Sequence, residues 1–255
     1  MTIAIISLVL AVISAVIIAL DIKNNPQSMK IMKAVWILTA LWASIFGLIA
    51  YYWFGREKAM EMQASDMGDM TSEDMKGMGM SSEEMKDMKM PESEMKNMPM
   101  KMEMPSRPKW QSVTLSALHC GAGCTLADII GSIILLFIPI SMFGSTLVGG
   151  WIFTFILAMI MGVYFQFVAI KEMNDLPAST IIKRALKADF LSLTSWQLGM
   201  YVWMYLAMFP WGLISPDSTL TWEFWFVMQQ AMLAGFVLAL PVNYFLIKFG
   251  VKSGM

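Results

Sequence analysis

The sequence predicts an all-α integral membrane protein with about six transmembrane helices. Of its 255 residues, 57% are hydrophobic and 15% are charged, and the apolar residues fall in long blocks. A hydrocarbon layer about 30 Å thick is crossed by roughly 20 apolar residues. Backbone groups in lipid have no water to bond, so blocks of this length should be helices. The blocks cover residues 2–20, 34–54, 113–140, 150–170, 192–214 and 222–247.

Features at the ends of these blocks support the assignment. The first block has no basic stretch before it and no small-residue cleavage site before Asp21, so we expect a retained helix rather than a signal peptide. Tryptophan favours the interface between lipid and water. Six tryptophans lie near expected helix ends: Trp53, Trp110, Trp151, Trp211, Trp222 and Trp225.

The composition divides the chain into three parts. Residues 1–55 hold two N-terminal transmembrane helices, residues 56–109 form a Met-rich acidic segment, and residues 110–255 form a four-helix module. Residues 60–105 contain eleven acidic and five basic side chains and no Leu, Ile, Val or aromatic residue. Such a segment cannot bury enough apolar surface to offset its chain entropy. We therefore expect a disordered or weakly helical loop between the second and third helices.

The Met-rich segment is a ten-residue repeat, EDMKGMGMSS, EEMKDMKMPE and SEMKNMPMKM, over residues 73–102. Fifteen of the chain's 28 methionines lie between Met60 and Met104. A thioether is neutral and soft, so closely spaced thioethers favour Cu(I) or Ag(I) over hard cations. An oxidant sink and a segment without function are the alternatives. The repeated candidate ligands are Met75, Met78, Met80, Met85, Met88, Met90, Met95, Met98 and Met100.

A second candidate site is the motif HCGAGCTLAD at residues 119–128, which contains the only histidine and both cysteines of the chain. Cys120 and Cys124 are four residues apart, which puts them on one helix face with Cβ atoms about 5–6 Å apart. Two thiolates there can bind one Cu(I), with His119 as a third ligand. Asp128 lies one turn further along, and a carboxylate inside a membrane is a functional candidate by default.

Three other interpretations of the two cysteines stay open. A structural disulfide is disfavoured, because cysteines four apart on an unbroken helix are poorly oriented for one. A redox pair is possible, although the spacing is CxxxC rather than CxxC. Close helix packing around Gly121 and Gly123 is the third.

Trp110, the run SALHCGAGCTLAD at residues 116–128 and the following four-helix block resemble a prokaryotic membrane family, the domain of unknown function number 4396. The resemblance covers roughly residues 108–250 and is carried by the signature HCGAGC-x-x-x-D. It implies a four-helix membrane module and a multi-pass protein of a prokaryotic cytoplasmic (inner) membrane, but no particular activity.

Two methionine stripes are expected inside the membrane. Met200, Met204 and Met208 recur every fourth residue on the fifth helix, and Met228 and Met232 share this spacing on the sixth. Such spacing resembles the sulfur filter of copper uptake channels, although those are small three-helix trimers and this chain is not. Ordinary helix packing is the alternative.

Lysine and arginine near the helix ends predict the orientation. With six spans, Lys23, Lys30 and Lys33 fall on one side and ten other basic residues, from Arg56 to Lys252, on the opposite side. The positive-inside rule then puts both termini and the Met-rich segment in the cytoplasm. The opposite insertion is the alternative, and with the Met-rich segment outside the same parts would make an importer. The stretch STIIKRALKADF at residues 179–190 resembles a basic amphipathic helix lying on the inner leaflet.

Together these features predict a protein that binds Cu(I), or a similar soft ion, and exports it for copper tolerance. A non-transporting copper buffer or sensor is the main alternative, and a membrane thiol oxidoreductase is a third. No nucleotide-binding GxxxxGK[ST] loop is present, so transport should be downhill or proton-coupled, with Asp128 and Asp189 as candidate acids.

The expected cofactors and partners follow from the same features. We expect no enzymatic activity, no organic cofactor and no nucleic-acid partner. The lipid bilayer is the expected surrounding, and a copper chaperone and a second copy of the chain are candidate partners.

Overall fold

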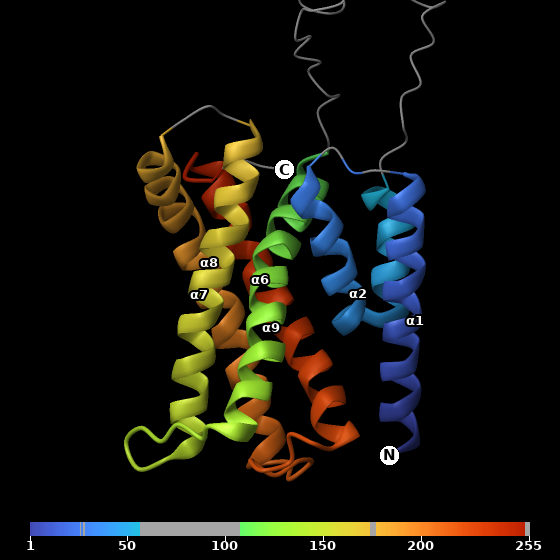
Figure 1. Cartoon of the computed structure of the whole chain (residues 1–255), viewed down its shortest axis with the longest axis vertical. Coiled ribbons are helices and arrows are strands. Elements are labelled where there is room, and N and C mark those ends of the chain that lie inside the picture. The colour runs from blue at the N-terminus through green and yellow to red at the C-terminus, as the bar shows by residue number, and fades with distance from the viewer. Residues whose placement is uncertain (26, 28, 57–107, 174–176, 253–255) are drawn as a thin grey trace, which may run out of the picture. The chain divides into compact units, whose positions relative to one another are not determined.

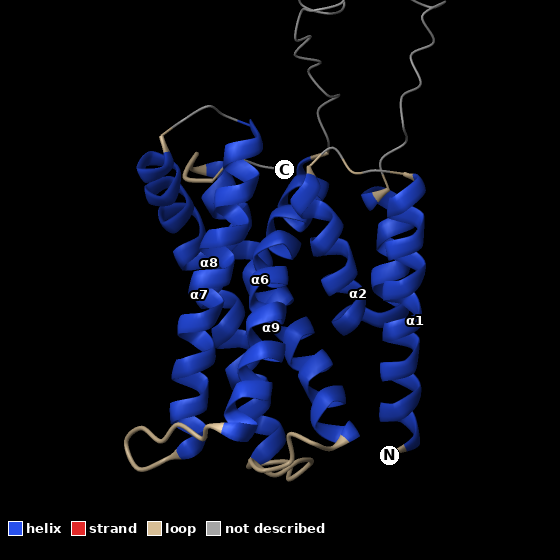
Figure 2. Cartoon of the chain, viewed as in Figure 1, coloured by secondary structure: helices blue, strands red, loops and turns tan. Residues whose placement is uncertain are grey.

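In the computed structural model, the described residues are 1–25, 27, 29–56, 108–173 and 177–252. They form helices and connecting loops (Figures 1 and 2). The elements are α1 (Thr2–Asn24), α2 (Lys30–Ala50), the π-helical turn η1 (Tyr51–Gly55), α6 (Lys109–Phe137), α7 (Thr146–Met173), α8 (Ala178–Met208) and α9 (Trp222–Lys248).

The prediction of an all-α integral membrane protein is confirmed. Five helical segments are long and apolar enough to cross a membrane: α1, α2 with η1, α6, α7 and α9. The remaining long helix, α8, has 31 residues and is more polar than the others. The predicted count of six spans is therefore approximate: α8 is not among the five, and α2 does not follow a straight path.

The segment α2–η1 turns back on itself instead of crossing the bundle (Figure 1). The helix breaks at Ser44, whose φ of 51° and ψ of −130° are not helical. After the break the chain returns to the end of α1, where the Tyr51 hydroxyl donates to Asp21 at 2.8 Å and Arg56 pairs with Asp21 at 3.0 Å. Residues 30–56 therefore form a re-entrant hairpin that begins and ends at the same end of the bundle.

Small residues let the two limbs of the hairpin approach closely. Gly55 lies against the ring of Trp36, where a Cβ atom would clash. A Cβ atom on Gly47 would lie 3.1 Å from the Cα atom of Ala40. The Trp36 ring also meets Tyr51 edge-on, with centroids 5.5 Å apart.

The tip of the hairpin is tied to the bundle by hydrogen bonds. The break leaves carbonyl groups of the first limb without helical partners, and lipid offers none. The Gln229 amide of α9 donates to the Leu41 carbonyl at 2.8 Å and accepts from the Ser7 hydroxyl of α1 at 2.7 Å. Ser44 Oγ donates to the Ser7 carbonyl at 3.3 Å. One glutamine thus joins α1, the hairpin and α9.

Helix α6 lies at the centre, in contact with α2, α7, α8 and α9. Gly121 permits this, because the Trp196 ring of α8 occupies the space a Cβ atom would need. Gly123 does the same toward α7, where a Cβ atom would lie 2.9 Å from the Cα atom of Gly162. The HCGAGC motif is therefore placed in the interior of the bundle, which its two glycines make possible.

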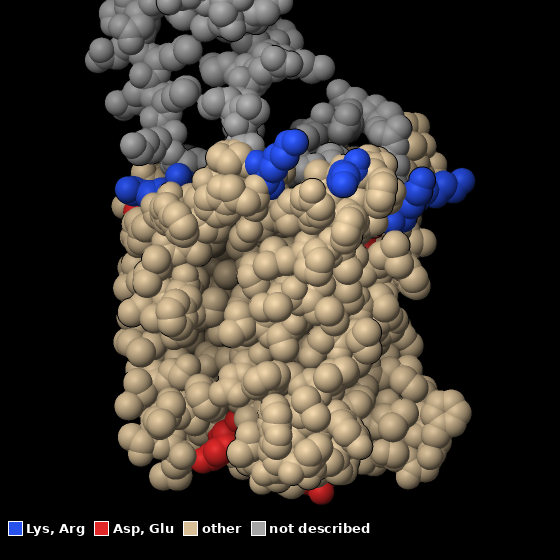
Figure 3. All heavy atoms as spheres, turned by 180° about the vertical axis from the view of Figure 1, so that it is seen from behind, with Lys and Arg blue, Asp and Glu red and all other residues tan. Residues whose placement is uncertain are grey.

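The bundle has two unlike ends. At one end Trp53 meets Trp110 at the start of α6, with centroids 5.5 Å apart, and Lys252 after α9 reaches α6; we call this the basic end. At the other, the loop end, lie the connections 138–145 and 209–221 and the ion pair between the Met1 amino group and Glu223. Figure 3 shows Lys and Arg gathered at one end, an uncharged belt and acidic side chains opposite.

The orientation expected for the N-terminal part is wrong. Because residues 30–56 turn back, Lys23 and Lys30 lie at the same end as Arg56, not at the opposite one. Met1 and Lys252, the first and last described residues, consequently lie toward opposite ends, since Met1 pairs with Glu223 while Lys252 lies at the basic end. The apolar composition of the segment could not reveal this, because a hairpin in lipid needs the same composition as a full crossing.

The amphipathic stretch 179–190 is not a separate surface helix. It continues without a break into the rest of α8 (Ala178–Met208). Ile181, Ala185 and Asp189 lie on its buried side, whereas Lys183 and Lys187 are exposed. The amphipathic pattern was predicted correctly, but its apolar side packs against other helices of the protein and not against the lipid surface.

The re-entrant hairpin predicts which positions share a membrane face. In native membranes, cysteines introduced by Lys23→Cys and Arg56→Cys should react with an impermeant maleimide from the same side. Ser215→Cys, in the connection 209–221, should react from the opposite side. The parent chain is the control, because Cys120 and Cys124 are buried. Labelling of Lys23→Cys and Arg56→Cys from opposite sides would show that the segment crosses.

Candidate functional site

A stripe of small polar and sulfur-containing side chains runs along the buried face of α6. Its members recur every fourth residue, which keeps them close to one line along a helix. All are buried, although the medium around the bundle is apolar. We call this the α6 polar stripe: Ser116, Cys120, Cys124, Asp128 and Ser132.

At the basic end, the stripe meets a buried ion pair. The Lys252 ammonium donates to Asp189 Oδ1 at 2.9 Å, to Cys120 Sγ at 2.8 Å, to Asn243 Oδ1 at 3.2 Å and to the Ser116 carbonyl at 3.4 Å. The Cys120 thiol donates to Asp189 Oδ1 at 3.0 Å. Neither side chain of the ion pair is exposed. We call these five residues the Lys252 cluster.

Neighbouring groups orient the cluster. Asn243 Nδ2 donates to Ser192 Oγ at 2.7 Å and to the Ala239 carbonyl at 2.9 Å, which leaves its Oδ1 directed at Lys252. Burial lowers the pKa of Lys252, but the Asp189 carboxylate and Cys120 raise it more. The net result is a pKa above the usual lysine value, so the ammonium form is retained.

The predicted ligands His119, Cys120 and Cys124 do not converge on one point. Among the described residues, no three His, Cys, Asp or Glu side chains are placed to hold a metal ion. The ring of His119 faces Phe165 of α7, with centroids 6.2 Å apart. Consecutive residues on a helix point about 100° apart, so His119 and Cys120 face different helices. Ligation by the cysteines stays a prediction.

The two thiols are both free and both buried. Cys120 contacts Asp189 and Lys252, whereas Cys124 lies one turn deeper in the bundle. The His119 nitrogens have no hydrogen-bond partner.

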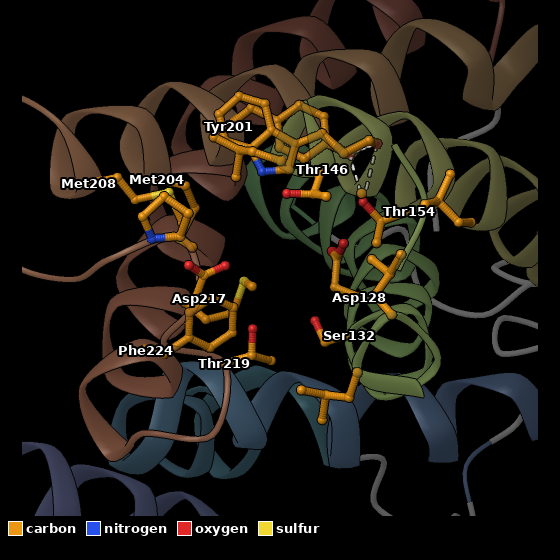
Figure 4. A pocket seen from close by; sticks show the side chains of 18 of the residues that line it. Asp128, Ser132, Thr146, Thr154, Tyr201, Met204, Met208, Asp217, Thr219 and Phe224 are labelled. Carbon is orange, nitrogen blue, oxygen red and sulfur yellow. Dashed lines mark hydrogen bonds between the residues drawn. The ribbon is translucent and has the colours of Figure 1, made fainter. Parts of the chain in front are cut away.

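Toward the loop end, the α6 polar stripe opens into a cavity of about 300 Å³. Side chains of α6, α7, α8 and α9 and of the two loop-end connections line it (Figure 4). The predicted stripe of α8 and the first methionine of the α9 stripe share this cavity: Met200, Met204, Met208 and Met228. Met232, the second methionine of the predicted α9 stripe, is buried but does not line the cavity; its sulfur lies 3.8 Å from the Thr125 hydroxyl.

Asp128 gives the cavity a carboxylate. The side chain is 2% exposed, and its Oδ2 atom has no hydrogen-bond partner. Asp217 and Thr219, of the connection before α9, line the cavity opposite Asp128 and Ser132 (Figure 4). A buried carboxylate oxygen without a hydrogen-bond partner is costly, and this makes Asp128 a candidate for binding a ligand or a proton.

Tyr201, Trp151 and Thr154, which line the cavity, contact one another. The Tyr201 hydroxyl donates to the Trp151 carbonyl at 2.7 Å, and their rings stack with centroids 5.0 Å apart. Thr154 Oγ1 lies 3.1 Å from the same hydroxyl.

Several residues of these sites escaped the sequence analysis. Lys252 was counted only as a charge for orientation, and Asn243 and Ser192 were not noticed. No local pattern marks these three. Ser116 and Ser132 carried a signal, since they extend the spacing of Cys120, Cys124 and Asp128 by one step at each end. The predicted methionine ligands of residues 75–100 lie outside the described residues.

These observations define a multi-pass helical membrane protein whose central helix carries a buried polar stripe from an ion pair to a thioether-lined cavity. A family model described as Domain of unknown function (DUF4396) matches residues 109–252. The match spans more than half of the chain, so the chain belongs to this family, as the resemblance of the HCGAGC region implied. A model described as Phospholipase_D-nuclease N-terminal matches residues 9–56, which correspond to α1 and the hairpin. No curated protein and no solved structure gives a significant match.

The Lys252 cluster yields a stability prediction. Asp189→Asn removes the carboxylate that pairs with the buried Lys252 ammonium, which should lower the free energy of unfolding by about 3–5 kcal/mol. The double variant Asp189→Asn/Lys252→Met has no unpaired charge and should recover most of this loss. The free energy of unfolding of each variant is measured on purified protein in mixed micelles with increasing dodecyl sulfate. Lys248→Met, at an exposed lysine, is the control. If Asp189→Asn is as stable as this control, the ion pair does not stabilise the fold.

Proposed function

We propose that the protein binds Cu(I), or a similar soft monovalent ion such as Ag(I), and moves it across the membrane, out of the cytoplasm. The observation that carries the proposal is the cavity at the loop end, where four thioethers share one space with Asp128, a carboxylate that has one oxygen without a hydrogen-bond partner. Thioethers beside a carboxylate suit a soft cation.

The chemistry of the cavity supports this choice of ion. Thioether sulfur is soft and neutral, so it binds Cu(I) well and hard cations such as Mg²⁺ poorly. Met200, Met204 and Met208 offer ligands in successive turns of α8, and Met228 offers one from α9. Neutral sulfurs leave the charge of the ion uncompensated, and the Asp128 carboxylate supplies the missing negative charge.

The α6 polar stripe supports passage rather than storage alone. It runs from the Lys252 cluster through Cys124 to Asp128, so a cation has polar or sulfur atoms beside it along α6. Met232 and Gln197 are buried on the facing helices α9 and α8. Thiolates at Cys120 and Cys124 would hold the ion between entry and cavity.

The charge distribution supports export. The positive-inside rule assigns the basic end to the cytoplasm, and both described residues that flank the Met-rich segment, Arg56 and Pro108, lie at this end. The repeated methionines would then collect the ion in the cytoplasm, directly or from a copper chaperone, and the cavity would release it outside. Asp128 and Asp189 are the candidate carriers of a counter-transported proton. We place the protein in the cytoplasmic (inner) membrane of a prokaryote.

One observation favours the alternative of a copper buffer or sensor. At the basic end, the Lys252 ammonium contacts Cys120 at 2.8 Å, which closes the stripe toward the cytoplasm. A protein that only stores the ion would need no opening there. Transport measurements separate the two functions.

The methionine stripe is tested by the triple replacement of Met200, Met204 and Met208 with leucine. Leucine nearly conserves volume, so the fold should survive at a cost below about 1.5 kcal/mol per site. Ag(I) flux into proteoliposomes should fall at least tenfold, because leucine has no lone pair for the ion. Met32→Leu, a buried methionine of the hairpin, is the matched control. If the protein is only a copper buffer, cells that produce the triple variant should tolerate copper as well as cells that produce the parent protein.

The thiols are tested by Cys120→Ser and Cys124→Ser. Each should weaken the tightest Cu(I) site at least tenfold in competition with a chromogenic Cu(I) chelator, because a single thiolate cannot replace a pair. Ser132→Ala, at the far end of the stripe, should leave this site unchanged. If the double cysteine variant keeps full binding and full copper tolerance, the cysteines serve only packing.

A further inference from the structure

Four acceptor atoms from α6, α8 and α9 converge on one point in the Lys252 cluster. They are Cys120 Sγ, Asp189 Oδ1, Asn243 Oδ1 and the Ser116 carbonyl oxygen, at 2.8–3.4 Å from the Lys252 nitrogen. All of the residues are buried. An inward-facing thiol, a carboxylate and two neutral oxygens are the ligand types of a cation site, and its present occupant is an ammonium of the chain itself.

We propose that this is the entry site for the transported ion, and that Lys252 is a tethered cation that occupies it and must withdraw when the ion binds. The inference rests on the proposed function for the identity of the ion. Lys252 is thus an inner gate: with the ammonium in place, Cys120 is unavailable from the cytoplasm.

The exchange balances in charge and in protons. In the closed state, the ammonium and the Asp189 carboxylate cancel, and Cys120 is a thiol. When Cu(I) binds, a bond forms between the metal and Cys120 sulfur, and the thiol proton passes to Asp189 Oδ1, already 3.0 Å away. The bound ion then neutralises the thiolate. The cluster is neutral before and after, which suits a monovalent ion; a divalent ion would add a positive charge unless the proton left the site.

The backbone after α9 allows Lys252 to withdraw. Helix α9 ends at Lys248, and Gly250 follows with a φ of +67°, a conformation that favours glycine. The amides of Val251 and Lys252 both donate to the Leu246 carbonyl, at 2.9 and 3.2 Å. Rotation at Gly250 would release these two bonds and carry the ammonium out while the helix stays intact.

A purely structural ion pair is the competing explanation. It also places Lys252 beside Asp189, but it assigns no role to the contact with Cys120. The two explanations differ in what happens at the Cys120 sulfur when the ammonium is removed. A gate exposes it and strengthens metal binding, whereas a structural pair does neither.

The test uses the full chain with Cys124→Ala, so that Cys120 is the only thiol. Lys252→Leu is compared with this parent and with Lys248→Leu, at an exposed lysine at the end of α9; leucine adds no metal ligand. Reaction with a maleimide measures access to Cys120, and competition with a chromogenic chelator measures Cu(I) affinity. Lys252→Leu should accelerate labelling and raise Cu(I) affinity, each at least tenfold, whereas Lys248→Leu should match the parent. Unchanged labelling and affinity in folded Lys252→Leu overturn the gate.

A second variant keeps the test decisive if Lys252→Leu does not fold. Asp189→Asn/Lys252→Leu leaves no unpaired charge, and its Cys120 should still react at least tenfold faster than that of the parent. A labelling rate equal to that of the parent overturns the gate in this variant too. Labelling requires no copper, so the two hypotheses fail separately. If the chain with both cysteines binds no Cu(I), the proposed function and the identity of the ion are overturned, while labelling still decides whether Lys252 covers the thiol.

Discussion

Inside a bilayer, a polar atom can be paired only by another part of the protein, and this constraint organises the whole structure. Gln229 pairs the backbone at the tip of the hairpin and holds α1, the hairpin and α9 together. Lys252 pairs with Asp189 and holds α6, α8 and the end of α9 together. These two polar ties lie at different depths. Between them, glycines of α6 allow the close packing that places its polar stripe in the interior.

Some buried polar atoms of the described residues lack a hydrogen-bond partner, both along the proposed path and away from it. Asp128 Oδ2 and both His119 nitrogens are examples near the path, and Thr39 Oγ1 and Trp36 Nε1 are examples in the hairpin; each such group costs stability. Asp128 faces a cavity whose thioethers provide no hydrogen bond of comparable strength. Unpartnered atoms also occur at the basic end, where Ser116 Oγ and Asp189 Oδ2 of the Lys252 cluster have no hydrogen-bond partner. The two ends of the stripe differ in another respect: an ammonium of the chain fills the basic end, whereas a cavity adjoins the stripe at the loop end.

Much of this arrangement was accessible from the sequence, and the errors have identifiable causes. Helical spacing correctly aligned Cys120 with Cys124 and Asp128, and it grouped Met200, Met204 and Met208, which line one cavity. The same spacing cannot make His119 share the face of Cys120, because adjacent residues point to different sides of a helix. The apolar block 34–54 was assigned as a crossing on composition, although the helix that contains it breaks at Ser44. That one error reversed the expected side of Lys23 and Lys30.

The sequence by itself determined the membrane class, the family and the line of residues on α6, because apolar length and helical periodicity are local properties of a chain. Only the tertiary structure decided that Lys252 lies beside Cys120, 132 residues away, and that the α8 and α9 methionines share a cavity with Asp128. These neighbours come from different helices, and their proximity depends on how helix faces and small residues pack. Local periodicity states which face a residue occupies, but it does not state which helix that face will meet.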